Sequence, residues 1–183
     1  PTQGFDELWR WMRQKFERDE EALQRLEHCM AFYHGEGRNL SMATAHWVSE
    51  LFADFGLLIL DPSEARLKKR ATSIFAKDLF ENTFLEAFSA QSDILKLHDI
   101  EPPAHFRACN VFWMDAYRRE RVVKQGNDFD LVDSNRKITR AEMQRILEAE
   151  PERISPNVLL RPLYQQAILP AVAYVAGPTE YLY

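Results

Sequence analysis

The sequence predicts an α/β fold in which helices alternate with the strands of a parallel sheet. Residues 57–60 and 171–176 are two short, continuous apolar runs, which is typical of strands that are buried on both faces. The sequence Asp61-Pro62-Ser63-Glu64 follows the first run and combines a capping side chain, a first-turn proline and a glutamate, which indicates a helix start. A helix, a buried strand and a crossover helix form one unit of a doubly wound sheet.

The first segment, residues 1–38, is predicted to contain one long amphipathic helix over residues 5–33, ended by Gly35 and Gly37. Its apolar side chains fall on a heptad-like seam that only Asp19 interrupts: Trp9, Met12, Phe16, Leu23, Leu26, Met30 and Tyr33. Such a seam packs on its own domain, packs on the remainder of a longer chain, or pairs with a partner helix. An aspartate within the seam weakens a self-paired coiled coil.

The second segment, residues 39–183, is predicted to hold the α/β core. Ser41 is expected to cap a helix that Gly56 ends in a left-handed conformation. Asp61 is interpreted as the cap of the next helix rather than as a catalytic acid. One face of that helix is apolar and consists of Leu67, Ala71, Ile74, Phe75 and Leu79.

An antiparallel insertion is predicted at about residues 100–135. Residues 110–114 have the composition of a strand, and residues 121–125 and 129–132 are expected to pair as a hairpin across Gly126-Asn127. This insertion interrupts the alternation of helices and strands.

Beyond the insertion, Thr139 and Glu142 have the spacing of a capping box for a helix that Pro151 ends. Pro162 is then expected to open a further helix and Pro170 to end it, before the apolar run at residues 171–176.

The C-terminal residues 155–183 are predicted to contain the functional site, because they mix prolines, neutral polar residues and a single arginine, Arg161, with apolar residues. In an open α/β sheet, ligands bind beyond the carboxyl ends of the strands. Three residues of the segment are expected there: Gly177, Thr179 and Glu180. A sheet strand close to a chain end is unusual, so the sequence is interpreted as a fragment of a longer enzyme.

The composition excludes several classes of protein. A net charge of −5 argues against binding to nucleic acid or an anionic membrane, since both need a concentrated positive field. The basic clusters at residues 66–70 and 118–124 lack interleaved aromatic side chains and are interpreted as solvated faces. No apolar run approaches the ~20 residues of a membrane span, so a cytoplasmic location is expected, with Cys29 and Cys109 as reduced, buried thiols.

Familiar catalytic and metal-binding motifs are not found. There is no GxGxxG after a strand, no GxxxxGK[ST] and no GxSxG, so no standard dinucleotide site, P-loop or nucleophile elbow is predicted. His98, His105 and Cys109 lack paired ligand spacing, and no metal site is predicted. A nucleotidyl-transfer enzyme with the same sheet architecture is a third alternative. It would need a phosphate-binding turn, which is not found here and which an N-terminal part of a longer chain could contain.

Four stretches taken together resemble a known family. They are FGLLILDP, NVFWM, SPNVLLRPLYQ and ILPAVAYVAGPTE, which lie in that order between residues 55 and 180. They are similar to the bacillithiol biosynthesis cysteine-adding enzymes, a family of cysteine ligases. The resemblance implies an internal segment that contains part of a Rossmann-like core and its antiparallel hairpin insertion, whereas the long N-terminal helix predicted above matches the family more weakly.

Family members are longer than this chain, with earlier motifs and a later helical coiled coil that forms a homodimer. The resemblance implies a reaction that joins cysteine to glucosaminyl-malate through an amide bond, with ATP or ADP as possible cofactors of the full-length protein. The segment alone is expected to be inactive.

This resemblance suggests roles for several polar residues. Arg161 is expected to bind the malate or an activating phosphate, since a guanidinium matches carboxylate and phosphate oxygens. Asn157 and Gln165 would orient the substrate, and Glu180 would accept an ammonium or hydroxyl group. The alternative is structural: Arg161 pairs with a carboxylate of the core and Asn157 caps a turn.

A different class of function also fits the sequence. The chain could be a non-catalytic interaction module in which the N-terminal helix binds a partner and the α/β part is scaffold.

Overall fold

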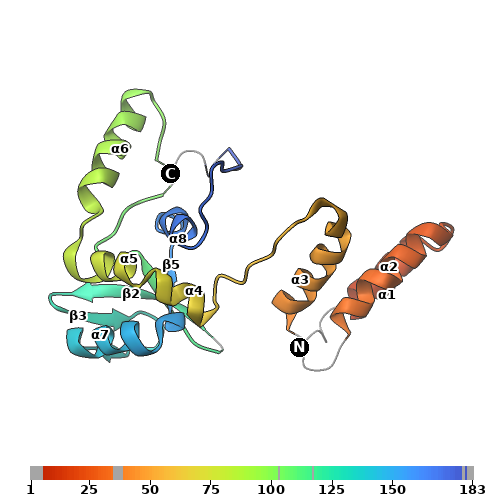
Figure 1. Ribbon diagram of the computed structural model, residues 1–183, viewed down its shortest axis with the longest axis horizontal. Helices are drawn as coiled ribbons and strands as arrows, with labels where there is room; N and C mark the ends of the chain where they lie inside the picture. Colours follow the sequence, from red (N-terminus) through yellow and green to blue (C-terminus); the bar gives the residue numbers. More distant parts are fainter. Residues whose placement is uncertain (1–5, 35–38, 103, 117, 179, 181–183) are drawn as a thin grey trace. The chain divides into compact units, whose positions relative to one another are not determined.

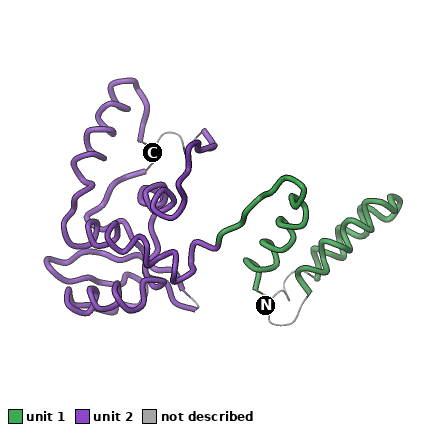
Figure 2. The backbone as a smooth tube through the Cα atoms, in the orientation of Figure 1, with its two compact units in different colours: residues 1–60 green, residues 61–183 purple. Residues whose placement is uncertain are grey.

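A computed structural model describes residues 6–34, 39–102, 104–116, 118–178 and 180. The chain divides into two compact units, Pro1–Leu60 and Asp61–Tyr183 (Figure 2). The sequence suggested a boundary after residue 38, whereas residues 39–60 group with the N-terminal helices. Contacts such as the hydrogen bond of 3.1 Å between the Tyr33 and Thr44 hydroxyls account for this grouping.

The described residues of unit 1 form the helices α1 (Asp6–Lys15), α2 (Glu20–Tyr33) and α3 (Leu40–Leu51) and a short 3₁₀ helix, η2 (Ala53–Phe55). The prediction of one long helix over residues 5–33 was wrong, because the chain turns between α1 and α2. Asp19 causes the break: its backbone is extended, and its side chain accepts a hydrogen bond of 3.0 Å from the Ala22 N–H as the cap of α2. The aspartate that interrupts the seam therefore ends one helix and begins another.

The seam residues Trp9, Leu26, Met30 and Tyr33 are buried together with Ala43 in a small core within unit 1. Helix α3 is capped by Asn39 rather than by Ser41, since the Asn39 side chain accepts from the Met42 N–H at 2.9 Å. The predicted ends of the first helix at Gly35 and Gly37 lie outside the described residues.

Unit 2 is built on a five-stranded sheet with the order β4-β3-β2-β1-β5, in which every pairing is antiparallel. The strands are β1 (Val111–Met114), β2 (Arg119–Gln125), β3 (Asp128–Leu131), β4 (Lys137–Ile138) and β5 (Ile154–Pro156). The predicted hairpin is confirmed: Gln125 pairs with Asp128 across a turn in which Gly126 has a φ of 62°. The positive φ explains why glycine occupies this position.

The helical elements of unit 2 pack beside this sheet or, in the case of α6, extend away from it (Figure 1). They are α4 (Ala65–Arg70), α5 (Thr72–Ala76), the π-helix η3 (Lys77–Glu81), α6 (Leu85–Leu97), α7 (Arg140–Ala149), the 3₁₀ helix η4 (Pro151–Arg153) and α8 (Arg161–Ile168). Thr139 caps α7 as predicted, accepting from the Glu142 N–H at 3.2 Å. Asp61 does not cap α4, because its carboxylate accepts from the backbone and hydroxyl of Ser63 in a local turn, and the helix begins four residues later.

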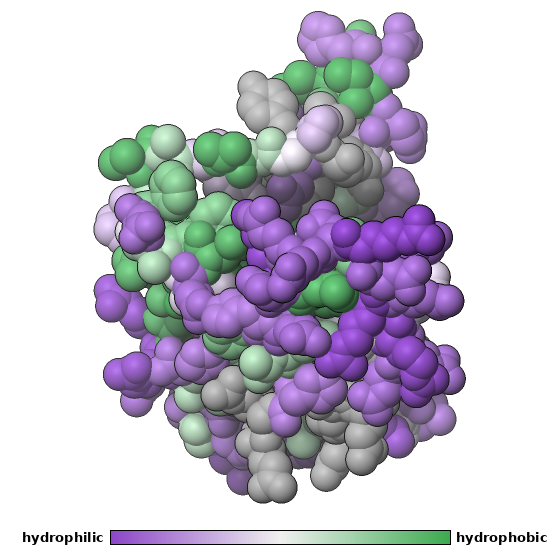
Figure 3. All heavy atoms as spheres, turned by 90° about the vertical axis from the view of Figure 1, so that its right-hand side faces the viewer, coloured by the Kyte–Doolittle hydropathy of each residue, from purple (hydrophilic) through white to green (hydrophobic). Residues whose placement is uncertain are grey.

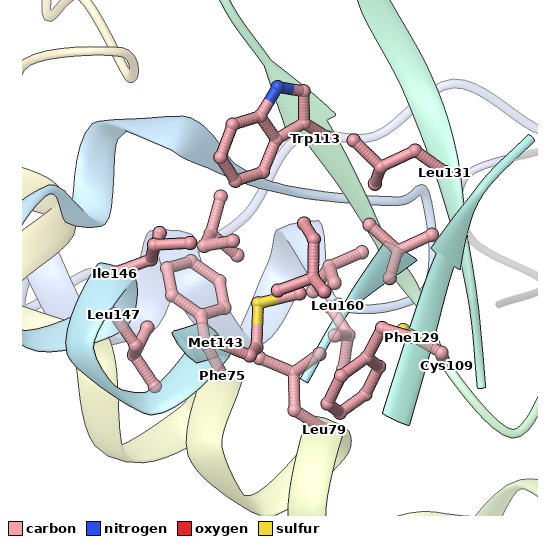
Figure 4. Packing of buried hydrophobic residues seen from close by; sticks show 14 of the residues in the cluster. Phe75, Leu79, Cys109, Trp113, Phe129, Leu131, Met143, Ile146, Leu147 and Leu160 are labelled. Atoms are coloured by element: carbon pink, nitrogen blue, oxygen red, sulfur yellow. The ribbon is translucent and has the colours of Figure 1, made fainter. Parts of the chain in front are cut away.

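The core of unit 2 lies between one face of the sheet and the helices α5, η3 and α7. In strands β1 and β3, buried positions alternate with half-buried or exposed ones, so one side of each strand packs inward. Figure 4 shows this packing, in which the helix side chains Phe75, Leu79, Met143, Ile146 and Leu147 meet side chains of the strands and of neighbouring loops. Trp113, Phe129 and Leu131 belong to strands, whereas Cys109 precedes β1 and Leu160 precedes α8.

The predicted strands at residues 57–60 and 171–176 are not strands in the structure. A strand forms only when another strand accepts its backbone hydrogen bonds, and neither run has such a neighbour among the described residues. Leu58, Val172 and Val175 are 87%, 103% and 96% exposed. Apolar side chains at the surface are visible in green in Figure 3. The parallel unit predicted from these two runs is therefore not formed by the residues that the structure describes.

A buried polar network connects η3, the start of β1 and the turn before α8. Asp78, which is 1% exposed, accepts from the backbone N–H of Asn110 at 2.7 Å and from its side-chain amide at 2.9 Å. The Asn110 side-chain oxygen accepts from the Asn157 amide at 3.1 Å, and the Asn157 backbone N–H donates to the Asn110 carbonyl at 2.8 Å. Burial raises the pKa of Asp78, and the hydrogen bonds from Asn110 oppose that shift.

We predict that Asn110→Ala destabilises unit 2 by about 3 kcal/mol, because it leaves Asp78 and Asn157 with unpaired polar atoms away from water. Urea unfolding at pH 7 would measure the free energy of unfolding. Asn127, exposed in the hairpin turn, provides the matched control, and Asn127→Ala should change it by no more than about 0.5 kcal/mol. Equal effects of the two substitutions would show that the network does not stabilise the unit.

Candidate functional site

The turn that leads into α8 is fixed by Asn157. Its side-chain oxygen accepts from the backbone N–H groups of Leu159 and Leu160 at 3.0 and 3.1 Å, and its carbonyl accepts from the Arg161 N–H at 3.0 Å. Pro162 lies in the first turn of α8, as predicted, where a missing N–H costs nothing. Asn157 thus caps a turn, as the structural interpretation of this residue expected. The turn positions Arg161.

Arg161 is the centre of a polar cluster at the beginning of α8. Its Nη2 lies 2.6 Å from Oε1 of Glu180, and its Nη1 donates to the Tyr174 hydroxyl at 3.1 Å. The second oxygen of Glu180 accepts from the Gly177 N–H at 3.1 Å. The Arg161 and Glu180 side chains remain 37% and 39% exposed, so solutes in water can reach this ion pair.

Next to this cluster lies a cleft of about 320 Å³ between α8 and the segment that follows it. Its lining consists of Pro162, Gln165, Gln166, Ala171, Val172, Ala173 and Tyr174. The structure thus brings Arg161, Gly177 and Glu180 together and places Gln165 on the wall of the neighbouring cleft. Asn157 is used within the protein, and Thr179 lies outside the described residues.

Lys68 was not predicted as part of this region, and its interpretation as a solvated residue was wrong. It is 2% exposed, and its ammonium donates to the Ile154 carbonyl at 2.7 Å. The ammonium also lies over the rings of Phe75 and Tyr164, 5.6 and 5.0 Å from their centroids. The sequence signal for the burial of Lys68 was its position seven residues before Phe75, because that spacing places both residues on one face of a helix.

Burial and, to a smaller extent, the nearby positive charge of Arg119 lower the pKa of Lys68 to about 8. Arg119 stacks on the Phe112 ring, with its guanidinium carbon 3.7 Å from the centroid, and donates to the Pro156 carbonyl at 3.2 Å. Lys68 and Arg119 therefore both hold the β5 backbone immediately before Asn157.

Tyr164 packs against these groups and donates its hydroxyl to the Pro62 carbonyl at 2.8 Å. Burial, followed by the negative charges of Asp61 and Glu64, raises the Tyr164 pKa to about 12. This geometry agrees with the sequence-based interpretation of Tyr164 as a packing residue with a bonded hydroxyl. Tyr174 differs, because its side chain is 47% exposed and its hydroxyl belongs to the Arg161 cluster.

The cysteines are free thiols, and burial raises the pKa of Cys109 to about 12, which disfavours the thiolate form. Among the described residues, no group of three or more histidine, cysteine, aspartate or glutamate side chains is arranged to hold a metal ion. Within the same residues, no helix is both long and apolar enough to cross a membrane.

We predict that Lys68 makes the stability of unit 2 depend on pH. The pKa of Lys68 is about 8 in the folded protein and about 10.4 in an unfolded chain, so between these values the unfolded state binds more protons and stability rises with pH. Relative to Lys68→Met, the wild-type chain should gain about 2 kcal/mol between pH 7 and pH 9.5. Urea unfolding at a series of pH values would measure this gain.

Lys69 is the exposed neighbour of Lys68 on α4, and Lys69→Met is the matched control. The stability difference between wild type and this control should not change across the same pH range. A flat difference for Lys68→Met as well would show that the ammonium is not desolvated in the folded protein.

Comparison with known proteins relates this geometry to a family. Residues 1–183 match the family described as "Bacillithiol biosynthesis BshC, N-terminal Rossmann-like domain". Relatives named "Putative cysteine ligase BshC" include proteins from Cytophaga hutchinsonii and Flavobacterium psychrophilum. Each is 35% identical to this chain over 79% of its length, which corresponds to 28% and 27% of the respective relatives.

A protein of the same name from Christiangramia forsetii is 28% identical over 100% of this chain and 34% of its own length. The chain thus spans about a third or less of the relatives that it matches. The match over all 183 residues shows that this chain belongs to the BshC family of bacillithiol biosynthesis, in the region of the N-terminal Rossmann-like domain.

Proposed function

We propose that this chain is part of a cysteine ligase that joins cysteine to glucosaminyl-malate by an amide bond. The observation that carries this proposal is the match of the whole chain to the BshC family, whose curated members are named as cysteine ligases. The glucosamine nitrogen would attack the carboxyl carbon of an activated cysteine and lose a proton, while the activating group leaves together with the former carboxylate oxygen. A free carboxylate reacts poorly with an amine, so the cysteine carboxylate must first be activated, for which ATP is the proposed co-substrate.

The Arg161 cluster supports a role in binding an anionic group. A guanidinium can bind carboxylate or phosphate oxygens through two parallel hydrogen bonds. In the structure, Nη2 of Arg161 donates to one carboxylate oxygen, Oε1 of Glu180, at 2.6 Å. We propose that the malate or an activating phosphate replaces Glu180 on Arg161. Glu180 would then be available to accept the ammonium or hydroxyl of a substrate.

Gln165, Gly177 and Thr179 complete the proposed substrate-binding set. Gln165 lies on the wall of the cleft beside Arg161, and the Gly177 N–H points to the Glu180 carboxylate. Asn157 is proposed to act by holding the turn that carries Arg161.

The activity is proposed for the complete protein, meaning a chain of the length found in its relatives. Because these 183 residues correspond to at most 34% of the relatives described above, we propose that they are inactive alone. The complete protein is proposed to be a cytoplasmic homodimer.

The test is to mix the complete protein with glucosaminyl-malate, cysteine and ATP and to measure the cysteine-joined product by mass spectrometry. Product formation that requires all three compounds would support the proposal. A folded complete protein that forms no product would refute the ligase assignment. It would favour the interaction module instead, for which unit 1 exposes Trp11 on α1 and Phe16 directly after that helix.

We predict that Arg161→Lys in the complete protein lowers kcat/KM by about 10-fold to 100-fold, because one charged hydrogen bond to the substrate contributes about 1.5–3 kcal/mol. Arg145 on α7 is exposed, and Arg145→Lys is the matched control with unchanged kcat/KM. Steady-state rates with glucosaminyl-malate as the varied substrate would measure the effect. Unchanged kcat/KM for Arg161→Lys would mean that Arg161 is a structural ion-pair residue only.

A further inference from the structure

A second cleft of unit 2, with a volume of about 560 Å³, shares no lining residue with the cleft beside Arg161. It lies between α5 and η3 on one side and α7 on the other. Ala76, Phe80 and Leu147 are buried or half-buried and form its apolar floor. A cavity of this size that combines apolar walls with a few polar groups is typical of small-molecule sites.

Four charged side chains, two of each sign, also line this cleft. The cations are Lys69 and Arg140, and the carboxylates are Glu81 and Glu148. Within the part of the chain that the structure describes, none of the four forms an ion pair. Charges of both signs that surround one cavity without neutralising each other are complementary to a ligand that also carries both signs.

The helices place one cation and one carboxylate at each end of the cleft. Arg140, the first residue of α7, lies over the Phe80 ring with its guanidinium carbon 4.7 Å from the centroid, and Glu81 directly follows Phe80. Glu148 lies further along α7, at a distance of about 12 Å along the helix axis. The 3₁₀ helix η4 follows α7 and contacts α4, the helix that carries Lys69. Lys69 and Glu148 therefore belong to the opposite end.

This spacing determines which ligand fits. In an α-amino acid, the ammonium nitrogen and the carboxylate carbon are only about 2.5 Å apart, so both charges need partners at the same end of the cleft. At one end, stacking on Phe80 orients Arg140, and Glu81 accepts a hydrogen bond of 3.2 Å from the Thr83 hydroxyl. Phe80 is itself fixed by an edge contact with the Phe129 ring, 5.9 Å between centroids. Side chains that are already oriented lose less entropy when they bind.

The backbone of η3 gives independent support for this end of the cleft. Residues Lys77–Glu81 form a π-helix, a rare conformation that occurs frequently at functional sites. The π-helix carries both Phe80 and Glu81, so it determines where the ring and the carboxylate lie relative to Arg140.

We propose that the Arg140 and Glu81 end of this cleft binds a free α-amino acid with an apolar side chain. The amino acid binds as its zwitterion, with the carboxylate on the Arg140 guanidinium and the ammonium on the Glu81 carboxylate. Its side chain lies on the floor formed by Ala76 and Leu147. This binding does not depend on the reaction proposed above, because the cleft shares no residue with the Arg161 cluster.

Isothermal titration calorimetry of the complete protein tests the proposal with L-leucine, which is apolar and takes no part in the proposed reaction. L-leucine should bind with a Kd of about 1 mM or lower. N-acetyl-L-leucine lacks the ammonium and isopentylamine lacks the carboxylate, so each should bind at least about 10-fold more weakly. Absence of L-leucine binding, or equal affinity for all three compounds, would overturn the proposal.

Substitutions test whether the binding occurs in this cleft. Glu81→Gln and Arg140→Gln should each lower the affinity for L-leucine by at least about 10-fold, because each removes a charged hydrogen bond. Arg145→Gln on α7 and Glu86→Gln on α6 are the matched controls, since both residues are exposed and neither lines the cleft. The controls should change the affinity by no more than about 2-fold. Unchanged affinity in both cleft variants would show that L-leucine binds elsewhere.

Melting temperatures separate a loss of binding from damage to the fold. L-leucine should raise the melting temperature of the wild-type protein and of the control variants, but not that of the cleft variants. If Arg140→Gln does not fold, Glu81→Gln decides the question, since Glu81 is exposed and its carboxylate bonds only to the exposed Thr83 among the described residues. A complete protein that binds L-leucine but forms no cysteine-joined product would separate this inference from the proposed function.

Discussion

The hydrogen bonds between Asp78, Asn110 and Asn157 are the constraint on which the organisation of unit 2 depends. They join a helix, the beginning of β1 and the turn before α8, three places that are far apart in the sequence. Because Asp78 is buried, each of its oxygens must receive a donor, and Asn110 supplies both donors. Asn110 can reach both oxygens only because it directly precedes the start of β1. The same residue then fixes the turn of Asn157.

The geometry of the candidate site follows from this constraint. Asn157 determines where α8 begins, and Arg161 is the first residue of that helix. From the other side, Lys68 and Arg119 hold the backbone of β5 just before the turn. The interior of the region is therefore fixed by specific hydrogen bonds, while Arg161 and Glu180 stay accessible to water. Rigid support beneath an accessible charged group is what a binding site for a small anion requires.

Local signals in the sequence predicted local structure well. The Gly126-Asn127 turn, the Thr139 cap and the proline at the start of α8 all lie where expected, since each depends on a few neighbouring residues. The runs at residues 57–60 and 171–176 did not become strands, because pairing depends on a second segment that sequence periodicity cannot supply. Lys68 was misread because its charge suggested exposure, although its helical spacing placed it on the buried face. Arg161 could be identified from the sequence because it is the single basic residue of its segment. The structure was needed to show that Glu180 and Tyr174 are its partners.

The contact between α4 and β5 also bears on how the chain folds during synthesis. Lys68 and its acceptor Ile154 are 86 residues apart, and Tyr164 and Pro62 are 102 residues apart. A ribosome must therefore synthesise most of unit 2 before α4 can contact the groups that bury it. Closing loops of this length also slows folding. Until β5 emerges, the apolar face of α4 and α5 remains exposed on the nascent chain. This interval is when unit 2 is most open to capture by chaperones or to misassembly.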